Sequence, residues 1–423
     1  MAEKFFVLNI KQFLDHVKQD MLVKNYSPIV GIGGAGIGKT AGIYELTQIL
    51  GIGYKELRLV NHTETDLIGI PYDEYNDRNS NGEHRTRFAA NTLLPTKSDG
   101  EEGILVLDEI TSCAPNIRAL ALQLLDSSRR VGDYKLPEKW KIIVLGNGSD
   151  DGAVNYQGLE LPVINRCECF RIENDYGCWR DWADTHNVNK MVIAFLNFMP
   201  SMFAKYPSAD EDDVCAFPTP RSWTELSFKL NLYENNTSGG VLDDFTVMML
   251  AQSRVGQEAG THFATFYRFK TDAPNVIELF KDPSLIAKQN WGELSMQVVH
   301  IVTQQCIQIL TDIYAAEGNG NAVTGNLLLT GALLTGNASQ SMVSAKSRDA
   351  TSTAVSIALA IAESKAIDVA VTMITQLANS SPTFKNIVLF DQMFDQQNPK
   401  FKAFYTKNAI VFNSAAVNNS KKI

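Results

Sequence analysis

The sequence predicts an α/β fold: a parallel five-stranded sheet flanked by helices, followed by a small helical domain and a further helical C-terminal region. The first 174 residues contain five short apolar runs, separated by polar loops and by segments with helical spacing. Apolar runs without alternation are typical of strands buried on both faces, as in a parallel sheet covered by helices. Beyond about residue 175, helical periodicity replaces the strand pattern. We therefore expect three regions, with residues 1–174, 175–265 and 266–423.

Each element of the sheet domain follows from spacing along the chain. The first 25 residues or so predict a helix, because apolar residues recur at helical spacing: Phe6, Ile10, Phe13, Leu14 and Val17. The runs that predict strands are 29–32, 57–60, 104–107, 142–145 and 169–172, with a helix over 39–50. The polar segment 72–101 predicts a hairpin or a long loop projecting from the sheet.

The remainder of the chain is predicted to be mostly helical. The clearest helical patterns cover 179–204, 221–233, 287–316 and 351–379. Between the last two lies 317–349, which is rich in Gly, Asn, Thr and Ser and predicts a loop or short helices.

Composition restricts the class of protein. The chain has 423 residues and a formal net charge of −9, and this acidic balance disfavours a duplex-DNA binder, whose affinity comes largely from Lys and Arg. The six cysteines are sparse and include no C-x-x-C pair, so we expect reduced thiols in a cytoplasmic protein. The start of the chain lacks a signal-peptide pattern, and the most apolar stretch, 354–362, is too short to span a bilayer. We therefore expect a soluble protein without membrane insertion.

A glycine-rich turn after the first expected strand carries the clearest chemical signal. It fits G-x-x-x-x-G-K-[ST] at every position, through Gly33, Gly34, Ala35, Gly36, Ile37, Gly38, Lys39 and Thr40. Glycines let successive backbone N–H groups turn inward and cradle phosphate oxygens, and the start of the following helix adds its positive dipole end. We predict that Lys39 reaches the β and γ phosphates of ATP and that Thr40 binds Mg²⁺.

Polar residues end the third and fourth expected strands. Asp108 and Glu109 follow the apolar run 104–107, and Asn147 follows the run 142–145. The carboxyl ends of strands in an open α/β sheet face the ligand. Asp108 can therefore hold Mg²⁺, Glu109 can polarise the attacking water, and the Asn147 amide can orient that water beside the γ-phosphate.

Two arginines complete the series: Arg166 precedes the fifth expected strand, and Arg221 follows Pro220 at the start of a helix. In this order the motifs resemble an AAA+ ATPase, and more closely its MoxR branch. The segment Asp66-Leu67-Ile68-Gly69 is similar to that branch's D-L-x-G segment. Later stretches are similar to its A-P, R-x-V-x-G and S-P-R elements: Ala114-Pro115, Arg129-Arg130-Val131-Gly132 and Pro220-Arg221. The resemblance covers about residues 5–262 and places nothing beyond about 265.

The resemblance implies a role for each remaining site residue. It implies Asn147 as first sensor, Arg166 as a finger that reaches a neighbour's ATP, and Arg221 as second sensor on the γ-phosphate of its own subunit. An arginine suits both positions because its planar fork bonds phosphate bidentately. Thr65 joins the nucleotide-contacting set. By the same resemblance, residues 1–174 form the nucleotide-binding AAA+ domain and residues 175–265 form its helical lid.

The same resemblance implies the activity and the partners. We expect Mg²⁺-dependent ATP hydrolysis by a homo-oligomer, a hexameric ring, that remodels or activates a protein partner, often one with a von Willebrand A-type domain. Two alternatives stay open: a nucleic-acid motor or loader, and a nucleotide-gated scaffold with little turnover. The first is disfavoured because the acidic chain has no dense Lys/Arg run with interleaved aromatics. The intact catalytic set disfavours the second.

Further roles are proposed for residues outside the motifs, and for some of them alternatives stay open. Asn61, His62 or Thr63 could supply a polar group that holds Glu109 inactive until substrate binds. Arg129 and Arg130 could line a subunit interface or form a solvated pair. The insert 72–101 is expected to touch the protein substrate.

Overall fold

The computed structural model describes residues 5–23, 27–76, 83–89, 92–148, 158–207, 216–317, 345–364, 367–380 and 382–408. The chain divides into two compact units. The first comprises Met1–Cys178 with Ala204–Ser222, and the second comprises Trp179–Phe203 with Trp223–Ile423. The further boundary expected near residue 265 stays a prediction.

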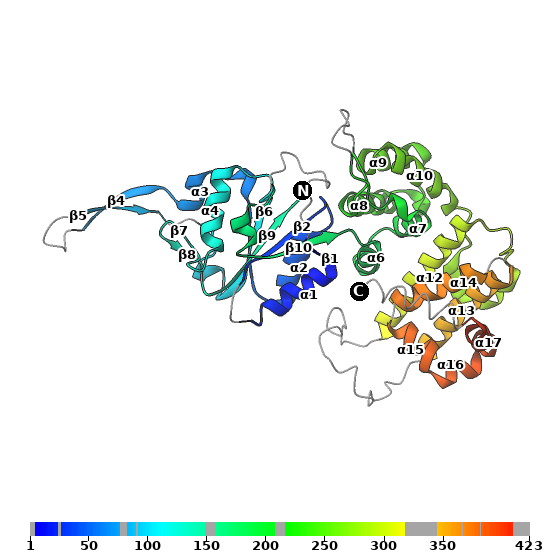
Figure 1. Ribbon diagram of the computed structural model, residues 1–423. Helices are drawn as coiled ribbons and strands as arrows, with labels where there is room; N and C mark the ends of the chain where they lie inside the picture. Colours follow the sequence, from blue (N-terminus) through cyan, green and yellow to red (C-terminus); the bar gives the residue numbers. More distant parts are fainter. Residues whose placement is uncertain are drawn as a thin grey trace. The chain divides into compact units, whose positions relative to one another are not determined.

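The first unit is built on a parallel sheet of six strands in the order β1-β10-β2-β9-β6-β3 (Figure 1). In that order the strands are Phe6–Asn9, Glu168–Glu173, Ile29–Gly33, Lys139–Gly146, Glu102–Asp108 and Gly53–Arg58. Its helices are α1 (Ile10–Asp20), α2 (Lys39–Leu50), α3 (Glu64–Ile68), α4 (Pro115–Leu125) and α5 (Leu161–Ile164). The predicted fold class, a parallel sheet flanked by helices with a helical C-terminal region, is confirmed.

Side chains of the central strands are buried on both faces of the sheet. In β6, Leu105 and Leu107 belong to a core cluster that includes Ile117 of α4. Ile104 and Val106 belong to a second cluster, which includes residues of α1 and α2. This arrangement explains the continuous apolar runs, since alternate residues of one strand meet a helix on either side.

The sheet has six strands rather than the five expected, because the predicted N-terminal helix was wrong at its start. Residues Phe6–Asn9 form β1, which pairs in parallel with β10, and α1 begins only at Ile10. The cause is a capping box: the Asn9 side chain accepts from the Gln12 N–H at 2.9 Å, and the Gln12 side chain accepts from the Asn9 N–H at 3.0 Å. This reciprocal pair fixes Asn9 as the N-cap, so the residues before it are free to extend along β10.

The second expected strand, 57–60, begins four residues earlier and ends two residues earlier, because β3 is Gly53–Arg58 and Leu59–Asn61 forms a single 3₁₀ turn. As an edge strand, β3 holds polar residues such as Lys55 and Glu56 that hide its pattern in the sequence.

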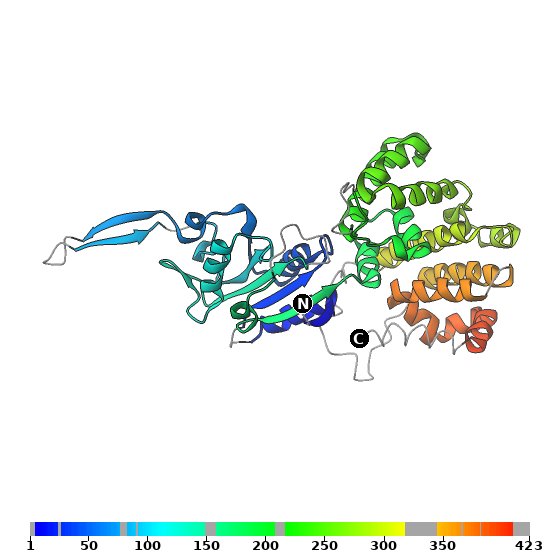
Figure 2. The same cartoon turned by 45° about the horizontal axis from the view of Figure 1, so that its top comes forward.

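The expected hairpin in the insert is confirmed. Strands β4 (Pro71–Asn76) and β5 (Glu83–Phe88) pair antiparallel and extend away from the six-stranded sheet (Figure 2). A second, short hairpin consists of β7 (Arg130–Val131) and β8 (Tyr134–Lys135). Asp133, in its turn, accepts a hydrogen bond from the Phe88 N–H at 3.1 Å, which joins the two hairpins.

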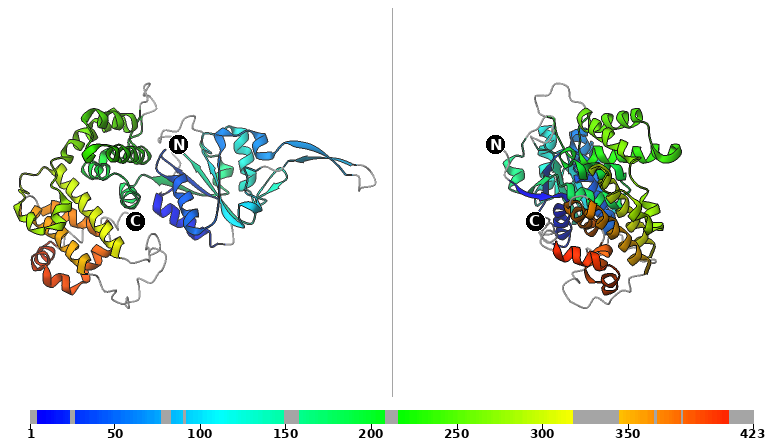
Figure 3. Two further views of the ribbon diagram at one scale, coloured as in Figure 1. Left: turned by 180° about the vertical axis from the view of Figure 1, so that it is seen from behind. Right: turned by 90° about the vertical axis from the view of Figure 1, so that its right-hand side faces the viewer.

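Helices make up the second unit (Figure 3), which includes most of α6 and α8. The helices are α6 (Tyr176–Thr185), α7 (Lys190–Phe198), α8 (Pro220–Asn236), α9 (Asp244–Val255), α10 (Gln257–Tyr267), α11 (Val276–Lys281), α12 (Met296–Glu317), α13 (Ala345–Ser364), α14 (Ile367–Ser380), α15 (Pro382–Phe390), α16 (Gln392–Gln397) and α17 (Pro399–Lys407). Most of the expected loop 317–349 lies outside the described residues. Within the described stretches of the chain, every helix is too short or too polar to cross a bilayer.

Candidate functional site

The glycine-rich turn joins the end of β2 to the start of α2. Gly36 and Gly38 have φ angles of 76° and 94°, in the left-handed region that favours glycine. Gly38 is the N-cap of α2, so the first free N–H groups of this helix lie at the turn. The loop therefore has the backbone geometry in which consecutive N–H groups can face an anion.

The Lys39 side chain is only 7% exposed, and its ammonium group has three acceptors. It donates to the carbonyl oxygens of Gly33 at 2.7 Å and Gly34 at 2.8 Å, and to Asn147 Oδ1 at 3.0 Å. These acceptors pair a buried ammonium group, which carries three N–H donors. The bond to Asn147 joins the loop after β2 to the end of β9.

Thr40 and Asp108 meet beside this loop. Thr40 Oγ1 donates to Asp108 Oδ2 at 2.8 Å, which joins the first turn of α2 to the end of β6. A hydroxyl and a carboxylate are oxygen ligands of the kind that Mg²⁺ prefers. The two residues would therefore suit a magnesium ion as ligands.

Glu109 follows Asp108 in a strained backbone conformation. Its φ angle is 61°, in the left-handed region that non-glycine residues seldom adopt. Hydrogen bonds hold the turn: the Glu109 N–H donates to Asp108 Oδ1 at 2.9 Å, and the Ser112 N–H donates to the Glu109 carbonyl at 3.0 Å. Strain of this kind persists where surrounding structure imposes it, commonly at functional sites.

Thr111 is a site residue that the sequence reasoning missed. It is fully buried, its hydroxyl donates to the Asn147 carbonyl at 2.9 Å, and it accepts from the Asn147 N–H at 3.1 Å. A Cβ added to Gly146 would lie 2.9 Å from the Thr111 side chain, so the approach requires glycine there. Thr111 thus fixes Asn147 against the turn that carries Glu109. The only sequence signal is its place two residues after Glu109.

Arg58 supplies positive charge near the two carboxylates. It ends β3 and is in register with Asp108 on β6. Its hydrogen bond to Glu56 raises the pKa of the guanidinium, and the charges of Asp108 and Glu109 raise it further. This arginine was also missed, because the strand that carries it was predicted to end at Val60 rather than at Arg58.

Three other predicted site residues make no side-chain hydrogen bond to Lys39, Thr40, Asp108 or Asn147 among the described contacts. The Arg221 N–H donates to the Gly36 carbonyl at 3.0 Å, so its backbone touches the glycine-rich loop while its side chain is exposed. Arg166 donates to the Pro162 carbonyl at 3.0 Å and lies 3.9 Å from Asp126. Thr65 is exposed on α3, where its hydroxyl pairs with Thr63 at 3.0 Å. The roles of these three residues stay predictions.

The structure also locates the residues with open alternatives. Asn61 is exposed in the 3₁₀ turn after β3. The Arg129 side chain donates to the carbonyls of Pro137, Glu138 and Trp140, so it holds the turn before β9 within its own chain. Arg129 is therefore not half of a solvated pair, whereas Arg130 is exposed.

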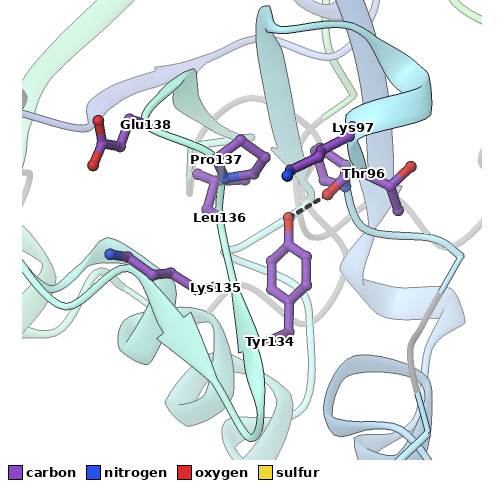
Figure 4. A pocket seen from close by; sticks show the side chains of 8 residues that line it. Thr96, Lys97, Tyr134, Lys135, Leu136, Pro137 and Glu138 are labelled. Carbon is purple, nitrogen blue, oxygen red and sulfur yellow. Dashed lines mark hydrogen bonds between the residues drawn. The ribbon is translucent and has the colours of Figure 1, made fainter.

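A pocket of about 380 Å³ lies elsewhere on the first unit (Figure 4). It is lined by Pro95–Lys97 and Tyr134–Glu138 and shares no residue with the cluster around Lys39. The Tyr134 hydroxyl donates to the Pro95 carbonyl at 2.7 Å, and burial raises the pKa of this phenol. The Tyr134 hydroxyl thus joins the two segments that line the pocket.

No family model matches the chain, and no curated protein matches it. Among the solved structures that match is a protein of Cytophaga hutchinsonii provisionally named an ATPase. The two share 12% sequence identity with a TM-score of 0.29, over 67% of this chain and 91% of that chain. A likeness this weak leaves the site to be interpreted from its own geometry.

Proposed function

We propose that the chain is a Mg²⁺-dependent ATPase of the AAA+ class. One observation carries the proposal: at the carboxyl ends of β2, β6 and β9, Lys39 is hydrogen bonded to Asn147 and the adjacent Thr40 to Asp108, beside the glycine-rich loop. This site suits a nucleoside triphosphate bound with a divalent cation. The Lys39 ammonium group and the N–H groups of the loop would bind phosphate oxygens, and the Thr40 hydroxyl and the Asp108 carboxylate would bind the cation.

Each residue has a distinct task in this proposal. Lys39 exchanges its carbonyl acceptors for phosphate oxygens, and Thr40 and Asp108 hold Mg²⁺, which neutralises charge on the β and γ phosphates. Glu109 accepts a proton from the attacking water, and Asn147 orients that water. The bond between Lys39 and Asn147 lets both respond to the same γ-phosphate.

Removal of the Lys39 charge tests the proposal. Lys39→Ala should weaken binding of Mg-ATP by at least about 100-fold, because a buried charge–phosphate contact is lost. Titration calorimetry measures this, and Lys135→Ala, at an exposed lysine of β8, is the matched control. If Lys39→Ala and the parent bind Mg-ATP with equal affinity, the glycine-rich loop is not the phosphate-binding loop.

We further propose that the active form is a MoxR-like ring, a hexamer, which remodels a protein partner, including partners with a von Willebrand A-type domain. The sequence motifs support the MoxR assignment, and the exposed position of Arg166 suits an arginine that acts on a neighbouring subunit. Affinity capture with Glu109→Gln, which should retain ATP and hold its substrate, tests the partner proposal. Recovery of the same proteins with Lys39→Ala would show that capture is independent of nucleotide.

A further inference from the structure

Four carbonyls of the glycine-rich loop are paired, two by Lys39 of the motif itself and two by residues far away in the sequence. A loop that turns N–H groups toward a ligand turns carbonyl oxygens away from it, and buried carbonyls need donors. Lys39 serves the carbonyls of Gly33 and Gly34. The Ala35 carbonyl accepts from the Tyr206 hydroxyl at 3.0 Å, and the Gly36 carbonyl accepts from the Arg221 N–H.

These two donors come from one segment, here named the strap, which comprises residues 204–207 and 216–222. Its two pieces are joined by a hydrogen bond from the Lys205 N–H to the Pro218 carbonyl at 3.0 Å. The Tyr206 and Phe217 rings pack with centroids 6.0 Å apart. Asn174, just after β10, donates to the Tyr206 hydroxyl at 3.2 Å. Tyr206 is thus held by Phe217 within the strap and by Asn174 at the end of β10.

Tyr206 also explains why position 34 is glycine. A Cβ built on Gly34 would have only Tyr206 atoms as its three nearest neighbours: the hydroxyl, Cζ at 2.7 Å and Cε2 at 3.2 Å. Position 38 differs, because a Cβ there would meet nothing within 4 Å and glycine is required by its φ angle of 94°. One glycine accommodates Tyr206, and the other accommodates a backbone turn.

We propose that Tyr206 is a positioning residue for the P-loop: its hydroxyl caps the Ala35 carbonyl and its ring fills the space beside Gly34. The strap would thereby hold the loop in its phosphate-binding conformation. This inference rests on the proposed nucleotide function. It adds a residue outside the motif that sets nucleotide affinity without touching the reacting atoms.

The first test removes only the hydroxyl. Tyr206→Phe should weaken Mg-ADP binding by about two- to tenfold, the range for the one hydrogen bond that the loop loses. KM for ATP should rise in parallel while kcat changes less than about twofold, since the loop is affected and the chemical groups are not. Tyr233→Phe, at a tyrosine that is 40% exposed on α8, is the matched control and should bind like the parent. Unchanged affinity of Tyr206→Phe would overturn the inference.

The second test is a double-mutant cycle on the contact itself. Gly34→Ala should weaken Mg-ADP binding because its methyl group meets Tyr206. Adding Tyr206→Ala should recover about tenfold, since the obstacle is removed. Gly38→Ala should not be rescued by Tyr206→Ala, because its defect lies in backbone strain. Additive losses at Gly34 and Tyr206, or equal rescue of Gly38→Ala, would contradict direct positioning.

The outcomes separate this inference from the proposed function. A parent chain that binds Mg-ADP while Tyr206→Phe binds equally well overturns the positioning role and leaves the ATPase proposal intact. A parent chain that binds no nucleotide overturns both. Should Tyr206→Ala fail to fold, as judged by its denaturant transition, Tyr206→Phe still decides the matter.

Discussion

Glu109 has a backbone conformation that residues with side chains seldom adopt, and the residues on both sides are fixed by hydrogen bonds. The cost of such a conformation is about 1–3 kcal/mol. We interpret it as the means by which the carboxylate is turned out of the strand direction, while Asp108 stays with Thr40. In the proposed ATPase, these adjacent carboxylates have different tasks.

Glu109→Gln separates binding from turnover. The amide keeps the shape of the side chain but cannot accept the proton of water, so kcat should fall by about 10²-fold or more. Mg-ATP affinity should stay within about threefold of the parent, because Lys39, Thr40 and Asp108 are unchanged. Phosphate release and calorimetry measure the two quantities. Glu102→Gln, at the exposed start of the same strand, is the control. Near-normal turnover of Glu109→Gln would assign the base to another residue.

Thr111 allows a test of how Asn147 is positioned. Thr111→Val keeps the volume of the side chain but removes the hydrogen-bond partner of the Asn147 N–H and carbonyl. The free energy of unfolding should therefore fall by about 1–3 kcal/mol. We also expect kcat to fall by about tenfold with little change in KM. Thr111→Ser retains the hydroxyl and should recover most of kcat. A serine variant as slow as the valine variant would show that packing, rather than the two hydrogen bonds, positions Asn147.

At the scale of elements, the β4–β5 hairpin projects from the sheet and adds no strand to it. The Ala89 N–H donates to the Ile70 carbonyl at 2.9 Å, so the pair 70/89 is hydrogen bonded. Hydrogen-bonded pairs alternate along an antiparallel ladder, which makes Tyr72 and Arg87 the next such pair. A two-residue turn can close the hairpin at this point.

Replacement of residues 73–86 by Asn-Gly should therefore shorten the hairpin without loss of folding. Basal phosphate release and the thermal midpoint should match the parent, because the catalytic cluster is built from other strands. Stimulation of turnover by a captured protein partner should be lost, as expected if the hairpin touches the substrate. If the partner still stimulates turnover of the shortened variant, the hairpin is not part of the substrate-binding surface. If the variant no longer assembles, the hairpin has a structural role.

How far the sequence predicts each element depends on where the element packs. Strands β2, β6 and β9 were predicted because both of their faces are buried, and the P-loop because its motif occupies eight consecutive residues. Strands β1 and β3 lie at the sheet edges, where most residues are half-buried or exposed and the apolar pattern is incomplete. Tyr206 and Thr111 could not be predicted, since their hydrogen bonds join residues 171 and 36 positions apart.

For the whole molecule, Arg166 is the residue that distinguishes a ring from a single chain. Its side chain is 40% exposed, between α5 and β10, and its only ion pair among the described residues, with Asp126 at 3.9 Å, is long. Such a pair contributes little in water, so the guanidinium can exchange it for a neighbour's phosphate at small cost. In this account Arg166 completes a site on the next copy.

Action across an interface predicts rescue in mixtures. Arg166→Ala and Lys39→Ala should each lose activity, the first by about 10³-fold, as for other arginine fingers. Mixed rings should regain some of it, because a Lys39→Ala subunit can donate Arg166 to the intact P-loop of an Arg166→Ala subunit. Specific activity of the parent should also rise with protein concentration as rings form. Co-assembled mixtures that show no rescue would place Arg166 outside the active site.

Phosphate release from ATP by the parent chain, measured at ring-forming concentrations with Mg²⁺ and again with excess EDTA, decides whether the chain is a Mg²⁺-dependent ATPase. We expect saturable release that requires Mg²⁺ and falls to background in Lys39→Ala, because Thr40, Asp108 and Lys39 must act on the same triphosphate. Release that is equal with and without Mg²⁺, release that persists in Lys39→Ala, or no release by an assembled parent that binds Mg-ATP would contradict it.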